Sequence, residues 1–154
     1  MTPPQPRPPS LLALPSYTAA QVSKYGRRRL EKALREHDLL LGHLAILSAL
    51  GDFGPMSQQQ LADSLDFDKS HLVGRIDVLE ERDLGIRTQD PDDRRRHRVE
   101  LTTAGRALLR RLGPIAKRSQ KGFLDALTAA EQRTLISLLH RVLSANDAAR
   151  QGPR

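Results

Sequence analysis

Two helix-start signals, eleven residues apart, constrain the fold of this chain more than any other feature. Ser57 can cap a helix while Gln60, three residues later, reaches back to the backbone, a reciprocal pairing typical of a helix N-terminus. Asp68 is a second N-cap residue, and its helix is expected to run to about Arg82. Apolar residues flank both caps as hydrophobic staples, formed by Met56 with Leu61 and by Phe67 with Leu72. Two capped helices separated by residues 66–68 are the layout of a helix-turn-helix.

Good helix formers also occupy most of the sequence on either side of this motif. Gly and Pro at residues 51–55 stop the helix before it, Thr102 caps a helix after it, and residues 128–131 are a second capping-box sequence. Gly113 and Pro114 predict a kink in the helix that Thr102 caps. The further helices expected from these signals are residues 16 to about 37, 43–50, 103 onward, and 128 to about 145.

The apolar period changes from helical to alternating after Asp83. Residues 86–89 and 97–101 alternate as two short strands, and the segment 90–96 between them is strongly charged, which predicts a β-hairpin. Acidic residues precede a cluster of arginines at this tip: Asp90, Asp92 and Asp93, then Arg94, Arg95, Arg96 and Arg98. An Asp can brace a neighbouring Arg and leave another Arg free to enter a DNA minor groove, although a solvated charge run has the same composition.

The helix after Asp68 has two chemically different faces. Leu72, Ile76 and Leu79 recur at helical spacing and should point into the core. The opposite face is basic in its N-terminal half and acidic in its C-terminal half, with Lys69, Ser70, His71 and Arg75 followed by Asp77, Glu80, Glu81 and Asp83. In a recognition helix the N-terminal residues meet base edges in the major groove, so this polarity favours DNA binding.

Gly74 lies on the outward face of this helix and lowers its propensity by about 1 kcal/mol. A close approach of the helix backbone to DNA would explain a glycine here. A solvated amphipathic helix without a ligand is the alternative interpretation.

Composition excludes several other classes of protein. The 25 Lys and Arg outnumber the 18 Asp and Glu, a net charge of +7 that favours a polyanionic partner only weakly. The chain has no cysteine, which rules out disulfides, thiol catalysis and thiolate metal sites, and its five aromatic residues are too few for a base-stacking platform. No apolar run is long enough for a membrane span, and the N-terminus lacks a secretion signal, so we expect a cytoplasmic protein.

Catalytic and cofactor motifs are not found in the sequence. Its five histidines are scattered over different expected elements and form no local ligand pair for a metal. There is also no nucleophile elbow and no phosphate-binding glycine loop. We therefore expect no enzymatic activity, no metal site and no cofactor.

The motifs between Leu44 and Gly105 together resemble the winged helix-turn-helix of MarR-type bacterial transcription regulators. The matching segments are 57–65, 68–73, Leu79-Glu80, and 90–95 followed by the sequence Leu-Thr-Thr-Ala-Gly at 101–105, which is the most specific part. The resemblance implies a homodimer that binds a pseudo-palindromic DNA operator, with the recognition helix in the major groove and the wing in the minor groove. Asp83 and Gly85 depart from the pattern, since the family usually has Gly at the first position and a β-branched residue at the second.

Site residues carry over from this resemblance position by position. Ser57 and Gln58 fall where the family contacts phosphates, and the wing arginine falls at Arg95 with Asp93 as its brace. Ser70, His71, Val73 and Arg75 fall where the recognition helix meets bases and phosphates. With the neighbouring cations of both elements, the expected DNA-binding residues are Ser57, Gln58, Lys69, Ser70, His71, Val73, Arg75, Asp93, Arg94, Arg95 and Arg96.

The fold class expected is mainly α with a small β-hairpin wing, a winged helix-turn-helix flanked by dimerisation helices. The expected divisions are a disordered Pro-rich arm (1–15), an N-terminal dimerisation helix (16–40), the DNA-binding lobe (41–105), C-terminal dimerisation helices (106–147) and a flexible tail (148–154). The apolar residues Leu135, Ile136, Leu138, Leu139, Val142 and Leu143 form a stripe that is too wide for one small surface, which favours burial against another subunit.

The resemblance also implies a small-molecule effector, often an aromatic anion, bound between the dimerisation helices and the DNA-binding lobe. Tyr25, His43, Leu47 and Arg106 are candidate wall residues, although packing and surface roles are the simpler explanation for them. We therefore expect a homodimeric transcription regulator, most simply a repressor. An architectural winged-helix protein that coats DNA without a ligand or strong sequence preference is the main alternative, and a winged-helix module for protein contacts is a third.

Overall fold

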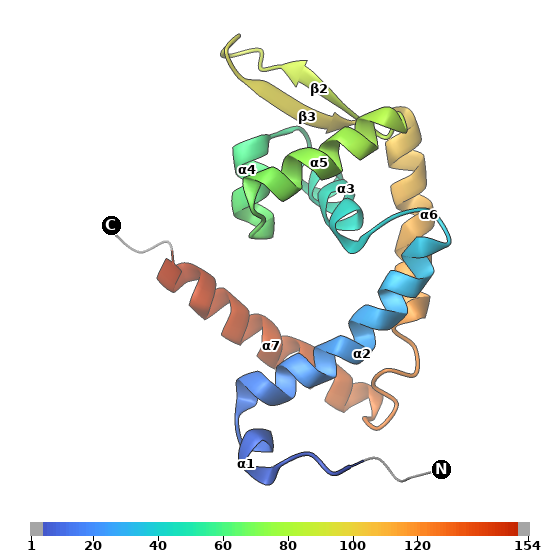
Figure 1. The fold of residues 1–154 in the computed structure, drawn as a ribbon, viewed down its shortest axis with the longest axis vertical. Helices are drawn as coiled ribbons and strands as arrows, with labels where there is room; N and C mark the ends of the chain where they lie inside the picture. The colour runs from blue at the N-terminus through green and yellow to red at the C-terminus, as the bar shows by residue number, and fades with distance from the viewer. Residues whose placement is uncertain (1–4, 151–154) are drawn as a thin grey trace. The chain divides into compact units, whose positions relative to one another are not determined.

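The computed structural model describes residues 5–150, which divide into two compact units with the boundary after Ser119. The second unit contains one helix, α7 (Ala129–Arg150). The elements of the first unit, in chain order, are α1 (Pro9–Leu12), α2 (Pro15–Arg35), α3 (Leu41–Phe53), β1 (Met56–Ser57), α4 (Gln58–Leu65), α5 (Lys69–Glu81), β2 (Gly85–Gln89), β3 (His97–Leu101) and α6 (Thr103–Ser119) (Figure 1).

The helix-turn-helix expected from the two capping signals is confirmed as α4 and α5. Asp66, between the two helices, has a left-handed backbone (φ 53°), a conformation that Asp tolerates better than most residues. Leu61, Leu72, Ile76 and Leu79 are buried as predicted. The two helices therefore meet at a fixed angle around a shared core.

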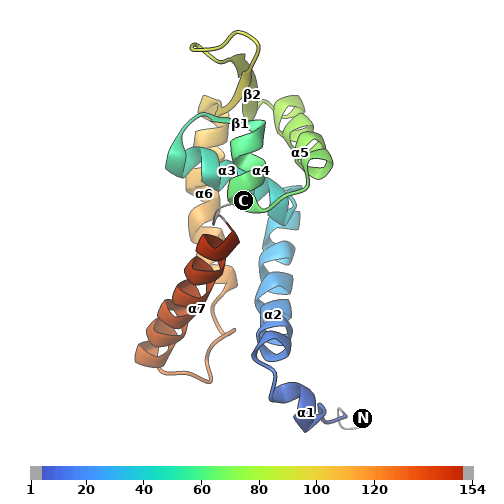
Figure 2. The same ribbon diagram turned by 90° about the vertical axis from the view of Figure 1, so that its left-hand side faces the viewer.

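A three-stranded antiparallel sheet with the order β1-β3-β2 forms the wing. Its hairpin, β2 and β3, extends beyond the helices of the first unit (Figure 2). The hairpin strands were predicted, but β1 was not, because it consists only of Met56 and Ser57, paired with Val99 and Arg98. This short strand attaches the beginning of α4 directly to the wing.

Asp83 and Gly85, the two residues that depart from the MarR pattern, are both compatible with the observed start of the hairpin. Asp83 is left-handed (φ 53°), which explains why glycine is usual at this position. A Cβ atom at Gly85 would meet the Glu100 carbonyl oxygen at 3.6 Å and the Leu79 Cβ at 3.7 Å, which are ordinary contacts. Gly85 therefore pairs with Leu101 as the first residue of β2, although it lacks the side chain that is usual at this position.

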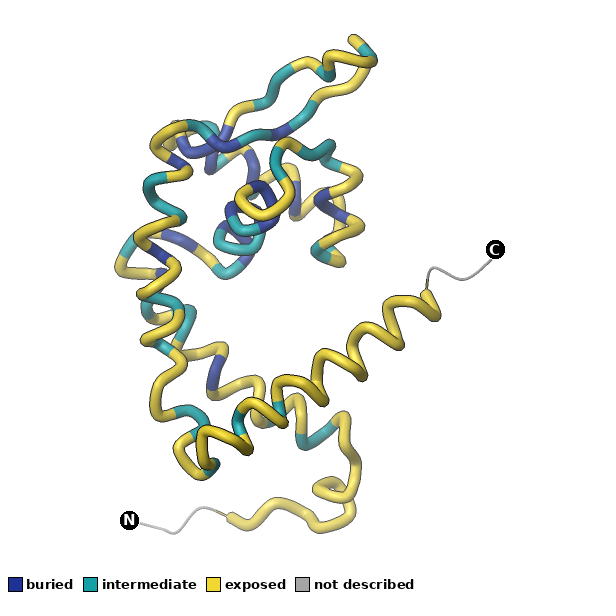
Figure 3. Tube along the Cα trace, turned by 180° about the vertical axis from the view of Figure 1, so that it is seen from behind, coloured by how far each residue is buried: buried dark blue, intermediate teal, exposed yellow. Residues whose placement is uncertain are grey.

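The core of the first unit lies between α3, α5 and the sheet (Figure 3). Fully buried side chains from helices and strands pack together there, so that recognition helix and wing share one apolar base. Those exposed by 1% or less are Leu34, Leu39, Ile46, Leu47, Leu61, Leu72, Ile76, Leu79, Val99 and Leu112.

The N-terminal arm differs from the extended chain that its prolines predicted. Pro9 starts the short helix α1, since proline is well suited to the first turn of a helix. Arg7 then fastens the arm to α2 by donating to the side-chain oxygen of Gln21 at 2.9 Å. Residues 1–4 lie outside the described residues, and α2 begins at Pro15 and ends at Arg35, two residues earlier than expected.

Two other helices are longer than predicted. The second helix was expected over residues 43–50, but α3 runs from Leu41 to Phe53, because the chain turns only at Gly54 with φ 80°. The last helix was expected to end near residue 145 before a fraying tail, but α7 continues to Arg150. Residues 151–154 of that tail lie outside the described residues.

The helix caps after the wing are confirmed. Thr102 Oγ1 accepts a hydrogen bond from the Gly105 amide at 3.0 Å at the start of α6, which continues past Pro114 to Ser119. Glu131 accepts from the Thr128 amide at 2.8 Å at the start of α7. In the part of the chain that the structure describes, no helix is both long and apolar enough to cross a membrane.

Candidate nucleic-acid interface

The first part of the candidate interface is the N-terminus of α4. The Ser57 hydroxyl accepts from the Gln60 amide at 3.1 Å, and the Gln60 side-chain oxygen accepts from the Ser57 amide at 2.8 Å. This capping box orients the first turn, including Gln58, with its positive dipole end outward. Such a helix end favours a phosphate, and the Ser57 hydroxyl proton is available to donate to one.

A cavity of about 750 Å³ lies between this helix start and the loop end of the wing hairpin. It brings the two residues expected to contact phosphates, Ser57 and Gln58, next to the wing's charged residues. Its lining residues are Ser57, Gln58, Gln59, Gln60, Asp90, Asp92, Asp93, Arg96, His97 and Arg98. The structure therefore joins α4 and the wing into one continuous polar surface.

Ion pairs divide the four arginines at residues 94–98 of the wing into two classes. Arg98 lies 3.1 Å from Asp90 and 3.6 Å from Asp92, and Arg96 lies 3.4 Å from Asp93. Arg94 and Arg95 are exposed and have no ion pair within the described residues. The free guanidinium groups are therefore those at the tip of the hairpin.

Asp93 was expected to brace the side chain of Arg95, but in the structure it does not contact that side chain. Its carboxylate pairs with Arg96, and it accepts only the backbone amide of Arg95, at 3.0 Å. Asp90 is held similarly: the Asp92 amide, and then Arg98, keep the pKa of its carboxyl below the usual range. Asp93 thus shapes the turn and does not hold the Arg95 side chain.

The N-terminal half of α5 is the third part of the interface. The Asp68 carboxylate accepts from the Ser70 amide at 2.8 Å and from the Ser70 hydroxyl, and these bonds lower its pKa. The Ser70 proton is therefore engaged in the cap. Lys69, His71 and Val73 are exposed beside it, available for contact.

Arg75 is placed differently from the other expected base-contacting residues. It is half-buried and lies back across Gly42 of α3, where an added Cβ would meet its Nε at 2.4 Å. Only a glycine at position 42 leaves room for this placement. Arg75 therefore does not extend from the exposed face of α5, a feature that helical periodicity could not reveal.

Arg87 also helps to build the candidate interface, although the sequence analysis did not identify it. From β2 it reaches the acidic half of α5, with its side chain paired to Glu80 and its Nη2 at 2.7 Å from Asp77. Its backbone amide also donates to Glu80 at 2.8 Å. This cluster fastens the wing to α5 and offsets two of the carboxylates that would repel phosphates.

The four candidate effector residues are not gathered into one site. His43 and Leu47 are buried in the core, whereas Tyr25 and Arg106 are exposed. His43 Nδ1 accepts from the Leu40 amide at 3.0 Å and so caps α3. Burial, with smaller contributions from Arg75 and Arg82, lowers its pKa, so the uncharged form predominates at neutral pH.

A second cavity of the first unit, of about 610 Å³, lies between α2, α3 and α5. None of the four residues lines it. Its polar wall includes Arg35 and Arg75, which have no ion-pair partner within the described residues, and its apolar wall includes Leu39 and Phe67. A cavity with two unpaired guanidinium groups and an apolar side suits an amphipathic anion.

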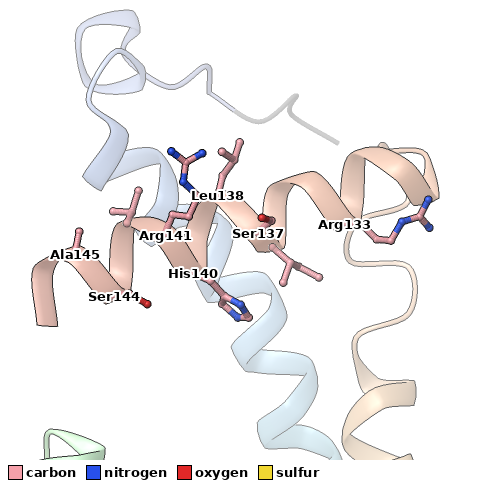
Figure 4. A pocket seen from close by; sticks show the side chains of 9 residues that line it. Arg133, Ser137, Leu138, His140, Arg141, Ser144 and Ala145 are labelled. Atoms are coloured by element: carbon pink, nitrogen blue, oxygen red, sulfur yellow. The ribbon is translucent and has the colours of Figure 1, made fainter. Parts of the chain in front are cut away.

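In the second unit, α7 is exposed along nearly its whole length. Figure 4 shows a hollow beside it, with polar residues such as Arg133 and His140 next to apolar ones. The exposed large apolar side chains of this helix are Ile136, Leu138, Leu139, Val142 and Leu143. An apolar stripe of this length is typical of a helix that packs against another protein surface.

In a comparison with known protein families, the model of the MarR family matches residues 39–97. This segment contains α3, the helix-turn-helix and the wing as far as the start of β3.

Individual relatives agree with this match. The HTH-type transcriptional repressor NicR of Pseudomonas putida is 34% identical over 103 residues, 67% of this chain and 65% of NicR, so the chain covers slightly less than two thirds of that relative. The crystal structure of a "probable transcriptional regulator" from Pseudomonas aeruginosa has a TM-score of 0.77 and 31% identity, covering 86% of this chain and 98% of that one. BpsR of Bordetella bronchiseptica, whose DNA binding is regulated by 6-hydroxynicotinic acid, has a TM-score of 0.77 and 25% identity, covering 90% and 97%.

Proposed function

The chain belongs to the MarR family of transcription regulators, and on that premise we propose that it is a homodimeric, sequence-specific DNA-binding repressor that a small anionic ligand releases from DNA. The observation that carries the proposal is that one compact unit contains three DNA-compatible parts: the start of α4, the start of α5 and the free arginines of the wing tip. They match the contacts that a winged helix-turn-helix makes with phosphates, the major groove and the minor groove.

Each part has its own task in this proposal. The α4 N-terminus binds a phosphate and fixes the register of the lobe on DNA. His71 and Val73, with Lys69 and Ser70, meet the major groove, where base edges differ. Arg94 and Arg95 follow the minor groove, whose negative potential attracts a guanidinium that lacks its own carboxylate partner.

Dimerisation is supported by the exposed apolar side chains of α7. A second copy of the chain is the partner that supplies two lobes for two half-sites, whose centres lie about 34 Å apart on one side of the DNA. Dimerisation also doubles the electrostatic contribution to affinity, which is why a modest net charge of +7 is sufficient.

The cavity between α2, α3 and α5 supports control by an anion. Arg35 and Arg75 are the groups that a carboxylate would pair with, while Leu39 and Phe67 would contact its apolar part. Its walls belong both to the helix expected to join the subunits and to the recognition helix. BpsR responds to 6-hydroxynicotinic acid, which is a carboxylic acid of this kind.

The test is selection of bound sequences from random duplex DNA, followed by binding measurements on the selected site and on a scrambled one. We expect an inverted repeat, and an affinity that falls steeply with salt by about 0.9 log units per log unit for each phosphate contact. His71→Ala should change the preferred bases, whereas Arg95→Ala should weaken binding to both DNAs. Continuous footprints on any sequence would instead support an architectural protein and contradict the proposed function.

A thermal-shift screen of aromatic acids on the same sample tests the ligand. An acid that stabilises the protein and lowers its affinity for the selected site supports the proposal, and an Arg35→Ala variant should lose that response. Acids that bind without changing DNA affinity would contradict release by a ligand.

A further inference from the structure

Arg82, the C-cap residue that follows α5, forms hydrogen bonds to the turn that follows another helix, α2. Its Nη1 donates to the Asp38 carbonyl oxygen at 2.9 Å and its Nη2 to the His37 carbonyl oxygen at 3.1 Å. These two carbonyls belong to the turn that follows α2. One guanidinium group thus spans the C-terminal ends of α2 and α5.

Both the carbonyl acceptors and the guanidinium donor are well suited to this contact. Both acceptor oxygens lie just beyond the C-terminal end of α2, where the helix dipole is negative, so a cation bound there is stabilised. Asp38 has a left-handed backbone (φ 54°), and this turn presents two successive carbonyl oxygens to one side chain. The planar guanidinium can satisfy both at once, which an ammonium group cannot do with the same geometry.

Few other contacts connect these two helices directly. The extensive packing of α2 is with α1, α3 and α6, whereas that of α5 is with α3, α4 and β2. The position of α5 relative to α2 is therefore set indirectly through α3 and α6, and directly by the Arg82 bonds.

The C-terminal end of α5 is also held from the other side. Thr102 Oγ1 donates to the Asp83 carbonyl oxygen at 2.6 Å. Gly105, in the first turn of α6, packs against Leu84, the residue after Asp83. A Cβ atom at position 105 would be only 1.9 Å from the Leu84 carbonyl oxygen. Among the residues that the structure describes, no side-chain hydrogen bond or ion pair joins the N-terminal end of α5, with Lys69, Ser70 and His71, to α2 or α6. Residues 82–84 are thus the fixed end of the recognition helix.

We propose that Arg82 is a positioning residue that fixes the recognition helix to the end of α2 and thereby sets the distance between the two half-sites that a dimer reads. This inference rests on the proposed function, in which α2 belongs to the dimerisation region. If α2 is held by the partner subunit, a bond from α2 to α5 determines where each recognition helix lies in the dimer. Loss of these hydrogen bonds should make the distance between the two recognition helices more variable, without removing any group that touches DNA.

The experiment compares the selected operator with versions lengthened and shortened by one base pair between the half-sites. One base pair changes their separation by about 3.4 Å and rotates one against the other by about 35°. Unmodified protein should discriminate strongly against both altered sites. For Arg82→Ala the ratio of affinities between the original and altered sites should fall by about three- to tenfold, the factor expected for losing hydrogen bonds from an exposed charged donor.

Two further variants make the result specific. Arg82→Lys keeps the charge and can reach one carbonyl, so its spacing discrimination should lie between those of Arg82→Ala and the unmodified protein. Arg28→Ala removes an exposed arginine of α2 that has no hydrogen bond or ion pair within the described residues, and it should leave the discrimination unchanged. Thermal unfolding of each variant is measured in parallel, because a purely stabilising role would lower the melting temperature and weaken binding to all sites equally.

Equal spacing ratios for Arg82→Ala and the unmodified protein would overturn the inference about Arg82 while leaving the proposed function intact. An unmodified protein that selects no paired half-sites would instead contradict the proposed function itself. The two failures are therefore distinguishable in the same binding series.

Discussion

Replacing Gly74 by alanine should change protein stability and DNA affinity in opposite directions. Gly74 lies inside α5 on its exposed face, and a Cβ built there has no neighbouring atom within 4 Å. The methyl group therefore meets no obstacle in the free protein. Because alanine is a better helix former than glycine by about 0.8–1.0 kcal/mol, the free energy of unfolding should rise by roughly that amount.

The same methyl group should obstruct DNA if the backbone of α5 approaches the major groove closely at this position. Inserting a methyl group into a packed contact costs about 1–3 kcal/mol, which corresponds to roughly 5- to 150-fold weaker binding. The melting temperature, in contrast, should increase by about 2–4 °C for a chain of this size. Thermal unfolding and binding to the selected operator measure the two effects independently.

Ser64→Ala is the matched control, because Ser64 is exposed near the end of α4 that lies away from the Ser57 cap. It should give a smaller gain in stability and no change in DNA affinity. If Gly74→Ala binds the operator as tightly as the unmodified protein, the glycine does not serve a close approach to DNA. If its stability does not increase, the reasoning from open space around Gly74 is wrong.

Substitutions in the wing, at His43 and on α7 should each have a distinct effect. Arg95→Ala should weaken DNA binding without lowering the melting temperature, whereas Arg98→Ala should lower the melting temperature because Asp90 and Asp92 lose their partner; salt-dependent binding and thermal unfolding separate the two. The folded-state pKa of His43 is lowered, so stability should be fully present above the unfolded value of about 6.5 and decline as the pH falls below it. Denaturant titrations at several pH values should show this decline, and His43→Gln, which can still accept the Leu40 amide, should remove the part due to residue 43. Leu139→Glu should convert the dimer to a monomer in sedimentation experiments without unfolding the DNA-binding lobe, since Leu139 is exposed on the separate unit that contains α7; a dimer that persists would exclude this face of α7 from the interface.

Features that depend on neighbouring residues in the chain could be predicted well from the sequence. The caps at Ser57 and Thr128 each depend on a side chain three residues away, so the relevant hydrogen bonds follow directly from residue type and spacing. The buried face of α5 follows likewise from helical periodicity, with Leu72 and Ile76 on one side. For these elements the local signals and the fold agree.

Features that depend on contacts between distant segments could not be predicted in this way. β1 is a strand only because Met56 pairs with Val99, and a two-residue strand has no alternating pattern of its own. Arg75 carries the charge expected of a base-contacting residue, but its direction is decided by the space above Gly42, more than thirty positions earlier in the chain. The role of His43 depends likewise on its surroundings in the fold, since its Nδ1 accepts from the Leu40 amide and caps α3.

Ion pairing explains how a chain with a modest net charge can present a sharply localised positive surface. The wing has four arginines and three aspartates within nine residues, and the sequence alone does not tell which arginines are neutralised. In the structure, Arg96 and Arg98 have carboxylate partners, whereas Arg94 and Arg95 at the tip have none within the described residues. Because a paired guanidinium must lose its partner before it binds a phosphate, the unpaired ones contribute more to DNA affinity. The aspartates therefore concentrate the available positive charge at the tip, where a minor groove would meet it.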